Sequence, residues 1–307
     1  MQATNRRAWQ ARLALMLIVG VAAAAACVVT LMWWKAPAAS GQEEPSPTGA
    51  NFVVRCPFSH RAQVDPIVDF GKTAHHMHDF FGNKTTSATS DLVTLRNAAS
   101  RSDHGTTCEP RPGTTFGDTA AYWIPKVSWT DSRRTTALKA NQTFFYYRAG
   151  LKDPASVKPY PAGLKIVTIQ GKNVEWRCQN GTWSTTPPTQ CSNGKLVVRI
   201  FFPDCLDVDD ATQQPVVDST DHRMHMVDAG SAGCPPSHPY PVPRLQTNFQ
   251  FPIPTTRGKP KLSSGAYSTM HADFFNAWQE GTLEDLVARC INDAPFTATN
   301  RKPTDCL

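Results

Sequence analysis

The fold is decided by a stretch in the second half of the chain, Leu196-Val-Val-Arg-Ile-Phe-Phe202. β-Branched and aromatic residues favour an extended strand, and the run has the length of a strand rather than of a helix. Six other segments share this composition, and several of them alternate apolar and polar residues: 51–56, 120–129, 143–148, 163–170, 173–178 and 245–251. The sequence therefore predicts a mostly β fold, either a sandwich or a distorted barrel.

Turn-forming residues lie between these segments along the whole chain. The sequence contains 25 Pro and 18 Gly, which predicts long loops between the strands. One helix is expected near the C-terminus over residues 282–292, where Thr282 precedes an acid at Asp285 and apolar residues recur at helical spacing. Residues 273–279 are expected to form a second short helix.

The N-terminal part of the chain predicts export. Residues 13–34 carry no charged side chain and follow a basic arm, residues 1–12, that contains Arg6, Arg7 and Arg12. About 20 apolar residues cross a bilayer, and a basic flank favours a cytoplasmic N-terminus. We expect a transmembrane signal anchor over 13–34 with the body outside the cell, or a secreted protein if this segment is a cleaved signal peptide.

The rest of the chain is expected to be a tether followed by one domain. Residues 35–50 are rich in Pro, Ala, Ser and Glu and cannot bury an apolar face, so we expect them to be disordered. Residues 51–307 then form a single extracytoplasmic β-rich domain, whose length is normal for an all-β fold.

Eight cysteines of this domain are expected to form four disulfides. An even number of cysteines in an exported chain is typical of a disulfide framework, and no Cys-x-x-Cys spacing suggests a zinc site. Pairing neighbours in sequence leaves the two N-terminal cysteines for each other. The predicted bridges are Cys178 to Cys191, Cys205 to Cys234, Cys290 to Cys306 and Cys56 to Cys108.

Histidines of the domain gather in three short clusters. His76 and His78 lie two residues apart, so an extended segment turns both to one face. His222 and His225 form the second cluster, and His271 belongs to the third. The first and third clusters echo each other, because Met-His-Asp-Phe-Phe at 77–81 and Met-His-Ala-Asp-Phe-Phe at 270–275 differ by one inserted residue. We expect the two segments to approach one pocket from opposite sheets.

Imidazole and carboxylate in this combination point to a metal site or to acid–base chemistry. Neutral imidazole binds zinc and copper, and carboxylates orient it. The predicted ligands of zinc or copper are His76, His78, His225 and His271. The residues predicted to orient these ligands or contact a substrate are Asp79, His222, His238 and Asp273. The alternative is a non-catalytic structural or adhesive module in which the histidines only hydrogen-bond loops.

Aromatic residues suggest cell-wall polysaccharide as a partner. Exposed aromatic rings stack on sugars, although at least half of these rings are expected in the core. The residues considered are Tyr122, Trp123, Trp129, Tyr146, Tyr147, Trp176, Trp183 and Trp278. A nucleic-acid partner is excluded, because the net charge is only +6 and the longest basic cluster is Arg133-Arg134. Nucleophile elbows, HExxH motifs and phosphate-binding loops are absent from the sequence.

Six motifs occur in an order that resembles a family of secreted proteins. They are Asp65-Pro-Ile-Val68 with His76-Met-His78, Tyr122-Trp-Ile-Pro125, Phe202-Pro-Asp-Cys205, Asp221-His-Arg-Met-His225, Gly233-Cys-Pro-x-x-His-Pro239 and Met270-His-Ala-Asp-Phe274. The family is a domain of unknown function found in soil bacteria and fungi, and in fungi it is often joined to wall-sugar-binding modules of the WSC type.

The resemblance spans residues 51–290 and implies a secreted single domain without a settled reaction. It places six histidines on family motif positions: His76, His78, His222, His225, His238 and His271. His60, His75 and His104 fall outside the motifs. The chain departs from the family at Leu206, where the family tends to carry Trp after the cysteine, so a sugar-stacking role at that position is not carried over.

Overall fold

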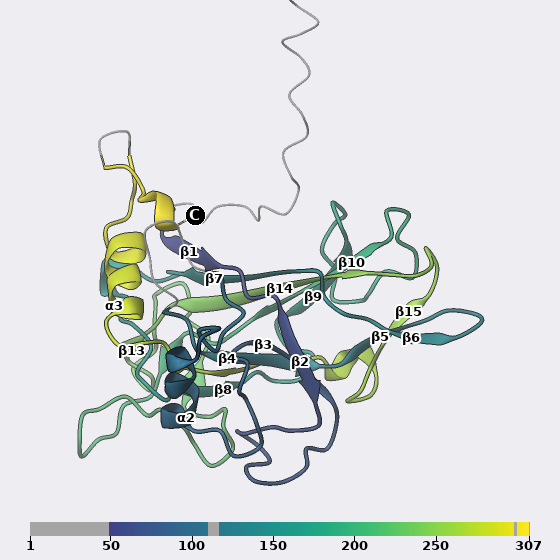
Figure 1. Cartoon of the computed structure of the whole chain (residues 1–307). Coiled ribbons are helices and arrows are strands. Elements are labelled where there is room, and N and C mark those ends of the chain that lie inside the picture. The colour runs from purple at the N-terminus through teal and green to yellow at the C-terminus, as the bar shows by residue number, and fades with distance from the viewer. Residues whose placement is uncertain (1–48, 110–116, 298–299, 307) are drawn as a thin grey trace, which may run out of the picture. The chain divides into compact units, whose positions relative to one another are not determined.

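The computed structural model describes residues 49–109, 117–297 and 300–306 (Figure 1). The predicted basic arm, the predicted span at 13–34 and nearly all of the predicted tether lie outside these residues. Among the residues that are described, no helix is long and apolar enough to cross a membrane.

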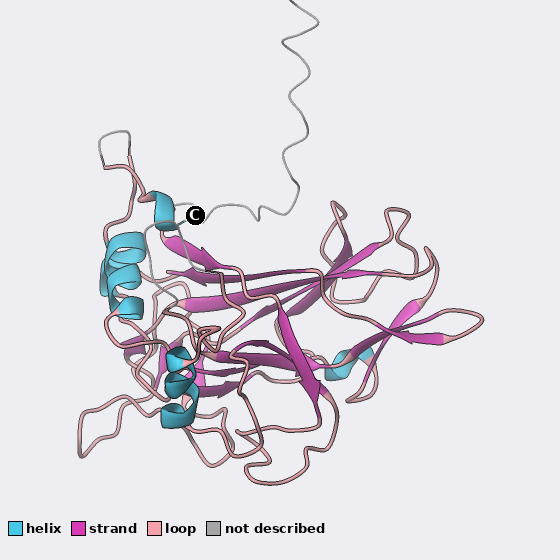
Figure 2. Cartoon of the chain, viewed as in Figure 1, coloured by secondary structure: helices cyan, strands magenta, loops and turns pink. Residues whose placement is uncertain are grey.

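Two five-stranded sheets make up most of the fold, and Figure 2 shows them as two layers of strands. Every neighbouring pair of strands in them is antiparallel. The first sheet has the order β1 (Asn51–Val54), β7 (Gln142–Arg148), β14 (Arg244–Pro252), β10 (Lys195–Phe201) and β9 (Val174–Cys178). The second sheet has the order β2 (Phe58–Ala62), β3 (His78–Gly82), β4 (Ala121–Pro125), β16 (Asp273–Phe275) and β8 (Lys165–Val167).

The main core lies between the two sheets, as in a β-sandwich. Tyr122 of the second sheet packs 4.2 Å from Phe145 of the first, and Phe81 packs 4.8 Å from Phe249, measured between ring centroids. All four side chains are at most 1 % exposed. Complete burial of such a side chain contributes about 1.5–3 kcal/mol, so this aromatic layer is a main source of stability.

A smaller apolar cluster covers the outer face of the second sheet. Phe80 and Trp123 lie on that face, and helix α2 (Leu92–Asn97) places Leu95 against them. Asp91 caps α2 by accepting from the Thr94 N–H. Ile67, from the loop between β2 and β3, joins the same cluster. This loop and helix therefore shield one side of the second sheet.

The remaining strands form two small antiparallel sheets at the edges of the domain. Their bounds are β15 (Lys259–Leu262), β5 (Val127–Thr130) and β6 (Thr135–Ala137) in one, and β12 (Met226–Val227), β11 (Cys205–Leu206) and β13 (Tyr240–Pro241) in the other. Lys126 separates β4 from β5, so the expected strand at 120–129 is two strands that belong to different sheets.

The helical predictions hold in part. The C-terminal helix is confirmed as α3 (Thr282–Val287), continued by a π-helical turn at Ala288–Asn292. Gly281, at a φ of 80°, occupies the N-cap position rather than Thr282. Helix α2 was not predicted, because six residues are too few for a clear apolar periodicity. The prediction of a helix at 273–279 is wrong, since β16 pairs there with both β4 and β8.

All four predicted disulfides are present. They join Cys56 to Cys108, Cys178 to Cys191, Cys205 to Cys234 and Cys290 to Cys306. The Cys56–Cys108 bridge closes the segment that contains β2, the loop after it and β3.

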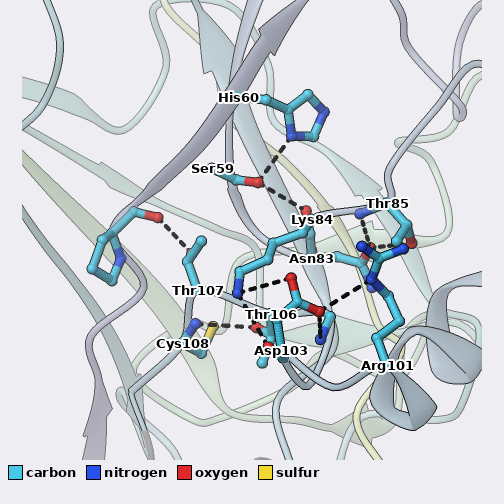
Figure 3. Close-up of polar contacts among 12 residues, drawn as sticks. Ser59, His60, Asn83, Lys84, Thr85, Arg101, Asp103, Thr106, Thr107 and Cys108 are labelled. Atoms are coloured by element: carbon cyan, nitrogen blue, oxygen red, sulfur yellow. Dashed lines mark hydrogen bonds and ion pairs between the residues drawn. The ribbon is translucent and has the colours of Figure 1, made fainter.

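Polar contacts reinforce this closed segment near the bridge (Figure 3). Asp103 is paired with Lys84 at 3.4 Å and with Arg101 at 3.1 Å. Thr107 donates its hydroxyl hydrogen to the carbonyl of Pro57 at 2.6 Å. These contacts fix the chain just after β3 against the loop that ends at Cys108.

Candidate metal centre

Strand β4 carries β3 on one side and β16 on the other. Antiparallel pairing sets His78 opposite Pro125 and Asp273 opposite Trp123. If the same register is extended by two residues, His271 also stands opposite Pro125, so that the two histidines flank one position of β4. The echoed motifs therefore meet in one sheet, and the expectation that they approach from opposite sheets is wrong.

The inserted residue Ala272 decides which carboxylate joins the histidines. Side chains alternate between the two faces of a strand, so Asp79, one residue after His78, faces away from it. Asp79 points to the core side and receives two hydrogen bonds from Arg61, at 2.5 and 3.0 Å. Asp273, two residues after His271, shares the face of the histidines. The structure thus brings Asp273 to the cluster and leaves Asp79 outside it.

Three imidazole rings meet on the outer face of the second sheet. The ring centroids of His76 and His78 are 4.3 Å apart, those of His76 and His271 5.2 Å, and those of His78 and His271 6.1 Å. One nitrogen of each ring lies within 4.8 Å of the corresponding nitrogen of the other two. We call His76, His78, His271, Asp273 and Asp65 the His/Asp cluster.

Backbone carbonyls fix the tautomers of two rings. Nδ1 of His78 lies 2.9 Å from the carbonyl of Val64, and Nδ1 of His271 lies 2.8 Å from the carbonyl of Thr269. A carbonyl only accepts, so each Nδ1 carries the hydrogen and each Nε2 of the neutral ring keeps a lone pair. Histidines that bind metals are commonly oriented by such a bond to a carbonyl.

Burial keeps the imidazoles neutral. It lowers the pKa of His78 to about 3, helped by repulsion from His76 and His271, and lowers the pKa of His271 to about 4. The pKa of His76 is lowered for the same main reason, although His76 is only half-buried. Neutral rings are the form that binds a metal ion.

The carboxyl groups of the cluster are buried as well. Asp273 is 1 % exposed, and burial raises its pKa well above the usual range, with a further rise from Asp65. Burial also raises the pKa of Asp65, whose Oδ1 accepts from the N–H groups of Ile67 and Val68. Asp65, His78 and Asp273 each place a ligand atom within 4.8 Å of the other two.

Several buried polar atoms of the cluster have no hydrogen-bond partner among the described residues. They are Nε2 of His76, Nε2 of His78 and both carboxylate oxygens of Asp273. His271 Nε2 lies 3.7 Å from Asp273 Oδ2, which is too far for a hydrogen bond, and burial opposes the charged form of both groups. An unpaired buried polar atom costs about 1–3 kcal/mol, so such a concentration in one place calls for a ligand.

A zinc-sized cation fits this donor set. At about 2.1 Å from each ligand in a tetrahedron, donor atoms lie roughly 3.4 Å from one another, so the three imidazole nitrogens, now within 4.8 Å of one another, would need to approach by about 1 Å to hold an ion. Three imidazole nitrogens and one carboxylate oxygen suit zinc or copper(II) better than calcium or magnesium, which prefer oxygen. A bound cation would also lower the pKa of Asp273 by favouring its charged form.

The other histidines predicted at the site lie elsewhere with partners of their own. Both ring nitrogens of His225 are bonded, to Ser219 Oγ at 2.9 Å and to the Lys165 carbonyl at 2.8 Å. His222 pairs with Asp218 at 2.7 Å, and His238 contacts the Met224 carbonyl at 2.9 Å. The structure does not bring these three residues into the His/Asp cluster.

Two of the histidines outside the family motifs are also accounted for. His60 lies 2.9 Å from Ser59 Oγ (Figure 3) and stacks on Phe80 with 4.7 Å between ring centroids. His75 is exposed and pairs with Asp69 at 3.0 Å.

Two members of the site were missed in the sequence. In the sequence, Asp65 stands out only as part of a motif, and no spacing rule links it to residues on β3 and β16. Trp123, whose Nε1 is buried without a partner, stands opposite Asp273 in the ladder. The one signal for either residue was its position in the motifs Asp65-Pro-Ile-Val68 and Tyr122-Trp-Ile-Pro125.

The aromatic residues considered for sugar binding are mostly core residues. Seven of the eight are buried, and Trp183 is the exception. Arg177 and Arg199 each lie 4.0 Å from the centroid of one ring of Trp183. The indole of Trp183 is therefore already stacked with arginine.

Comparison with known proteins gives one match. The family of the domain of unknown function (DUF1996) matches residues 65–278, which is more than half of the chain and contains the whole His/Asp cluster. No curated protein and no solved structure matches the chain. The chain belongs to the DUF1996 family.

Proposed function

We propose that this protein binds a divalent transition-metal ion, zinc in the first place and copper(II) in the second, at the His/Asp cluster. His76, His78 and His271 supply imidazole nitrogens and Asp273 a carboxylate oxygen. One observation supports this most directly: among the described residues, ligand atoms from two separate segments, 76–78 and 271–273, converge, and those of His76, His78 and Asp273 are buried without a hydrogen-bond partner. A structural core would have paired or replaced them.

We also propose that the metal site faces the cell exterior. Four disulfides favour folding in an oxidising compartment, and the uncharged segment at 13–34 provides an anchor or a signal peptide for export. His76 is partly exposed, so the cluster can exchange its ion with the surroundings. Zinc with four protein ligands keeps no open tetrahedral position, so hydrolysis at this site would need Asp273 to give way to a water molecule.

Metal analysis of the purified protein tests the proposal. We expect one equivalent of zinc to be retained through gel filtration and removed by a chelator. X-ray absorption at the zinc edge should show nitrogen and oxygen neighbours at about 2.0–2.1 Å and no sulfur at about 2.3 Å. Sulfur neighbours, or less than a tenth of an equivalent after incubation with excess zinc, would contradict the site.

The same His→Gln substitution at four positions distinguishes the proposed metal ligands from histidines outside the cluster. His78→Gln and His271→Gln should each lower zinc affinity at least 10-fold, because each removes a lone pair aimed at the ion. His225→Gln and His60→Gln are the controls, since both rings are partly or fully buried but lie outside the cluster. Equal losses in all four variants would favour the alternative of a structural or adhesive module.

The proposal does not extend to cell-wall polysaccharide. Among the described residues, the aromatic side chains that suggested sugar stacking are buried or covered by arginine. Binding of wall polysaccharide stays a prediction of the sequence.

A further inference from the structure

A cavity of about 420 Å³ lies beside β8, the edge strand of the second sheet. Its walls come from the segment after β8, from the loop at 221–228 and from the end of β10. This volume is in the range of pockets that take a small organic molecule, about 300–1,000 Å³.

The walls of the cavity are largely apolar. Val167, Phe201 and Met226 contribute to the lining, together with Ile169 and Met224. Ile169 is 52 % exposed and Met224 75 % exposed, so two large apolar side chains stand in contact with water at this site. Their exposure is accounted for if an apolar ligand covers them.

Most charged groups of the lining already have partners. Asp228 pairs with Lys172 at 3.0 Å and accepts from Asn173 at 3.1 Å. The carboxylate of Asp221 accepts from the N–H of Met224 at 2.9 Å and from the hydroxyl of Ser219 at 2.7 Å. Lys172 therefore neutralises Asp228, whereas Asp221 keeps its charge and is held by neutral donors of its own turn.

Arg223 differs from the other charged residues of the cavity. Within the described part of the chain, its guanidinium has no carboxylate partner, and its one polar contact is to the Asp221 carbonyl at 3.5 Å, at the limit of a hydrogen bond. The side chain is half-buried. A half-buried guanidinium without a counter-ion is suited to pair with an anion, in a bidentate way if the anion is a carboxylate.

We propose that this cavity binds a small organic carboxylate with an apolar body, whose charged group pairs with Arg223. The apolar body lies along Ile169, Met224 and Phe201. This assignment does not depend on the metal.

Calorimetric titration of the chelator-treated full chain with decanoate tests this assignment. We expect saturable binding of one equivalent and at least 10-fold weaker binding of decan-1-ol, which has the same apolar body without the charge. Arg223→Gln should weaken decanoate binding at least 10-fold. Met224→Glu, at an exposed position, should also weaken it by placing a like charge beside the ligand.

Arg133→Gln is the matched control, because it removes the same charge from an exposed position between β5 and β6. It should bind decanoate like the wild type, and near-UV circular dichroism should confirm that each variant folds. Equal binding of the acid and the alcohol, or equal loss in the Arg223 and Arg133 variants, would overturn the assignment.

Discussion

The protonation states of single residues set the charge of the His/Asp cluster in the metal-free protein. His78 and His271 are neutral because burial disfavours the imidazolium, and burial likewise disfavours the carboxylate of Asp273. The cluster is therefore a set of donors kept uncharged until a cation arrives. At Asp273, stability and metal affinity should therefore respond differently to substitution.

Asp273→Asn is expected to separate the two properties. The amide has nearly the shape of the carboxyl group and no charge to bury, so the free energy of unfolding of the metal-free protein should stay within about 0.5 kcal/mol or rise. Zinc affinity should fall at least 10-fold, because the oxygen ligand loses its charge. Denaturation in chelator and a zinc titration measure the two effects. A loss of several kcal/mol without a change in zinc affinity would show that Asp273 is structural.

His78→Gln should change how stability depends on pH. The folded pKa of His78, about 3, is below the ordinary value, so the unfolded chain binds more protons as pH falls from about 6.5. This histidine thus contributes stability above pH 6.5 that is lost as pH falls, by up to about 1.4 kcal/mol per pH unit.

Urea denaturation of the metal-free protein between pH 4.5 and 7 measures this effect. The difference in unfolding free energy between wild type and His78→Gln should shrink as pH falls. Asp65 and Asp273 have raised pKa values, so their contribution to stability changes with pH in the opposite direction. Subtracting the variant from the wild type removes this contribution, because both proteins contain the two residues. His75→Gln, with a side chain that is 84 % exposed, should keep the wild-type slope.

Members of the His/Asp cluster could be predicted from the sequence only where local spacing identifies them. His76, His78 and His271 could be recognised because each lies in a short polar-aromatic motif. Asp65 and the separation of His225 from the cluster could not, because both depend on how loops fold against the second sheet. Burial, which sets every pKa in the cluster, is a property of the finished packing.

At the scale of elements, side chains alternate between the two faces of β3, so the neighbours His78 and Asp79 lie in different environments. His78 faces the cluster, and Asp79 faces the core, where Arg61 neutralises it. Because Asp79 is fully buried, the fold is stable only if Arg61 pairs with this carboxylate.

Arg61→Ala should therefore destabilise the fold without affecting the metal. It leaves the buried carboxylate of Asp79 without its partner, which typically costs about 3–5 kcal/mol. Zinc affinity should match the wild type under conditions where the variant is folded. The double variant Arg61→Met/Asp79→Leu should recover most of the loss in urea denaturation. A loss of zinc from Arg61→Ala at full stability would place Asp79 in the metal site after all.

Strands within runs of aromatic and β-branched residues could be predicted from composition, including the short β1 and β8, whereas β16 could not. β10, β14 and β7 have seven to nine residues with a high content of aromatic and β-branched side chains. β16 has three residues, and its Phe274-Phe275 pair fits a helix or a strand equally well until β4 and β8 offer ladder partners. Tertiary pairing, rather than local preference, decides such segments.

For the whole molecule, the disulfides that could be predicted from sequence proximity differ in how much chain they constrain. The Cys56–Cys108 bridge has a sequence separation of 52 and encloses Asp65, His76 and His78, whereas Cys178–Cys191 has a separation of 13. A bridge that closes a longer loop removes more entropy from the unfolded chain.

Removing the first bridge should cost more stability than removing the second. The chain-entropy estimate is about 4 kcal/mol for Cys56→Ala/Cys108→Ala and about 3 kcal/mol for Cys178→Ala/Cys191→Ala. Burial of Cys56 and Cys108 adds to the difference, because their replacement leaves space in the core. Guanidinium denaturation of both variants measures it, and the reverse order of midpoints would contradict the entropy argument.

The placement of β3 and β16 on either side of β4 also sets an order of events. A newly made, unfolded chain offers an ion little more than the short segment at 75–78, because His271 and Asp273 arrive only when the last strand docks into the sheet. On the proposed function, the ion binds only after the second sheet is complete. The supply of metals in the compartment where folding finishes would then select the ion, rather than the supply at the ribosome.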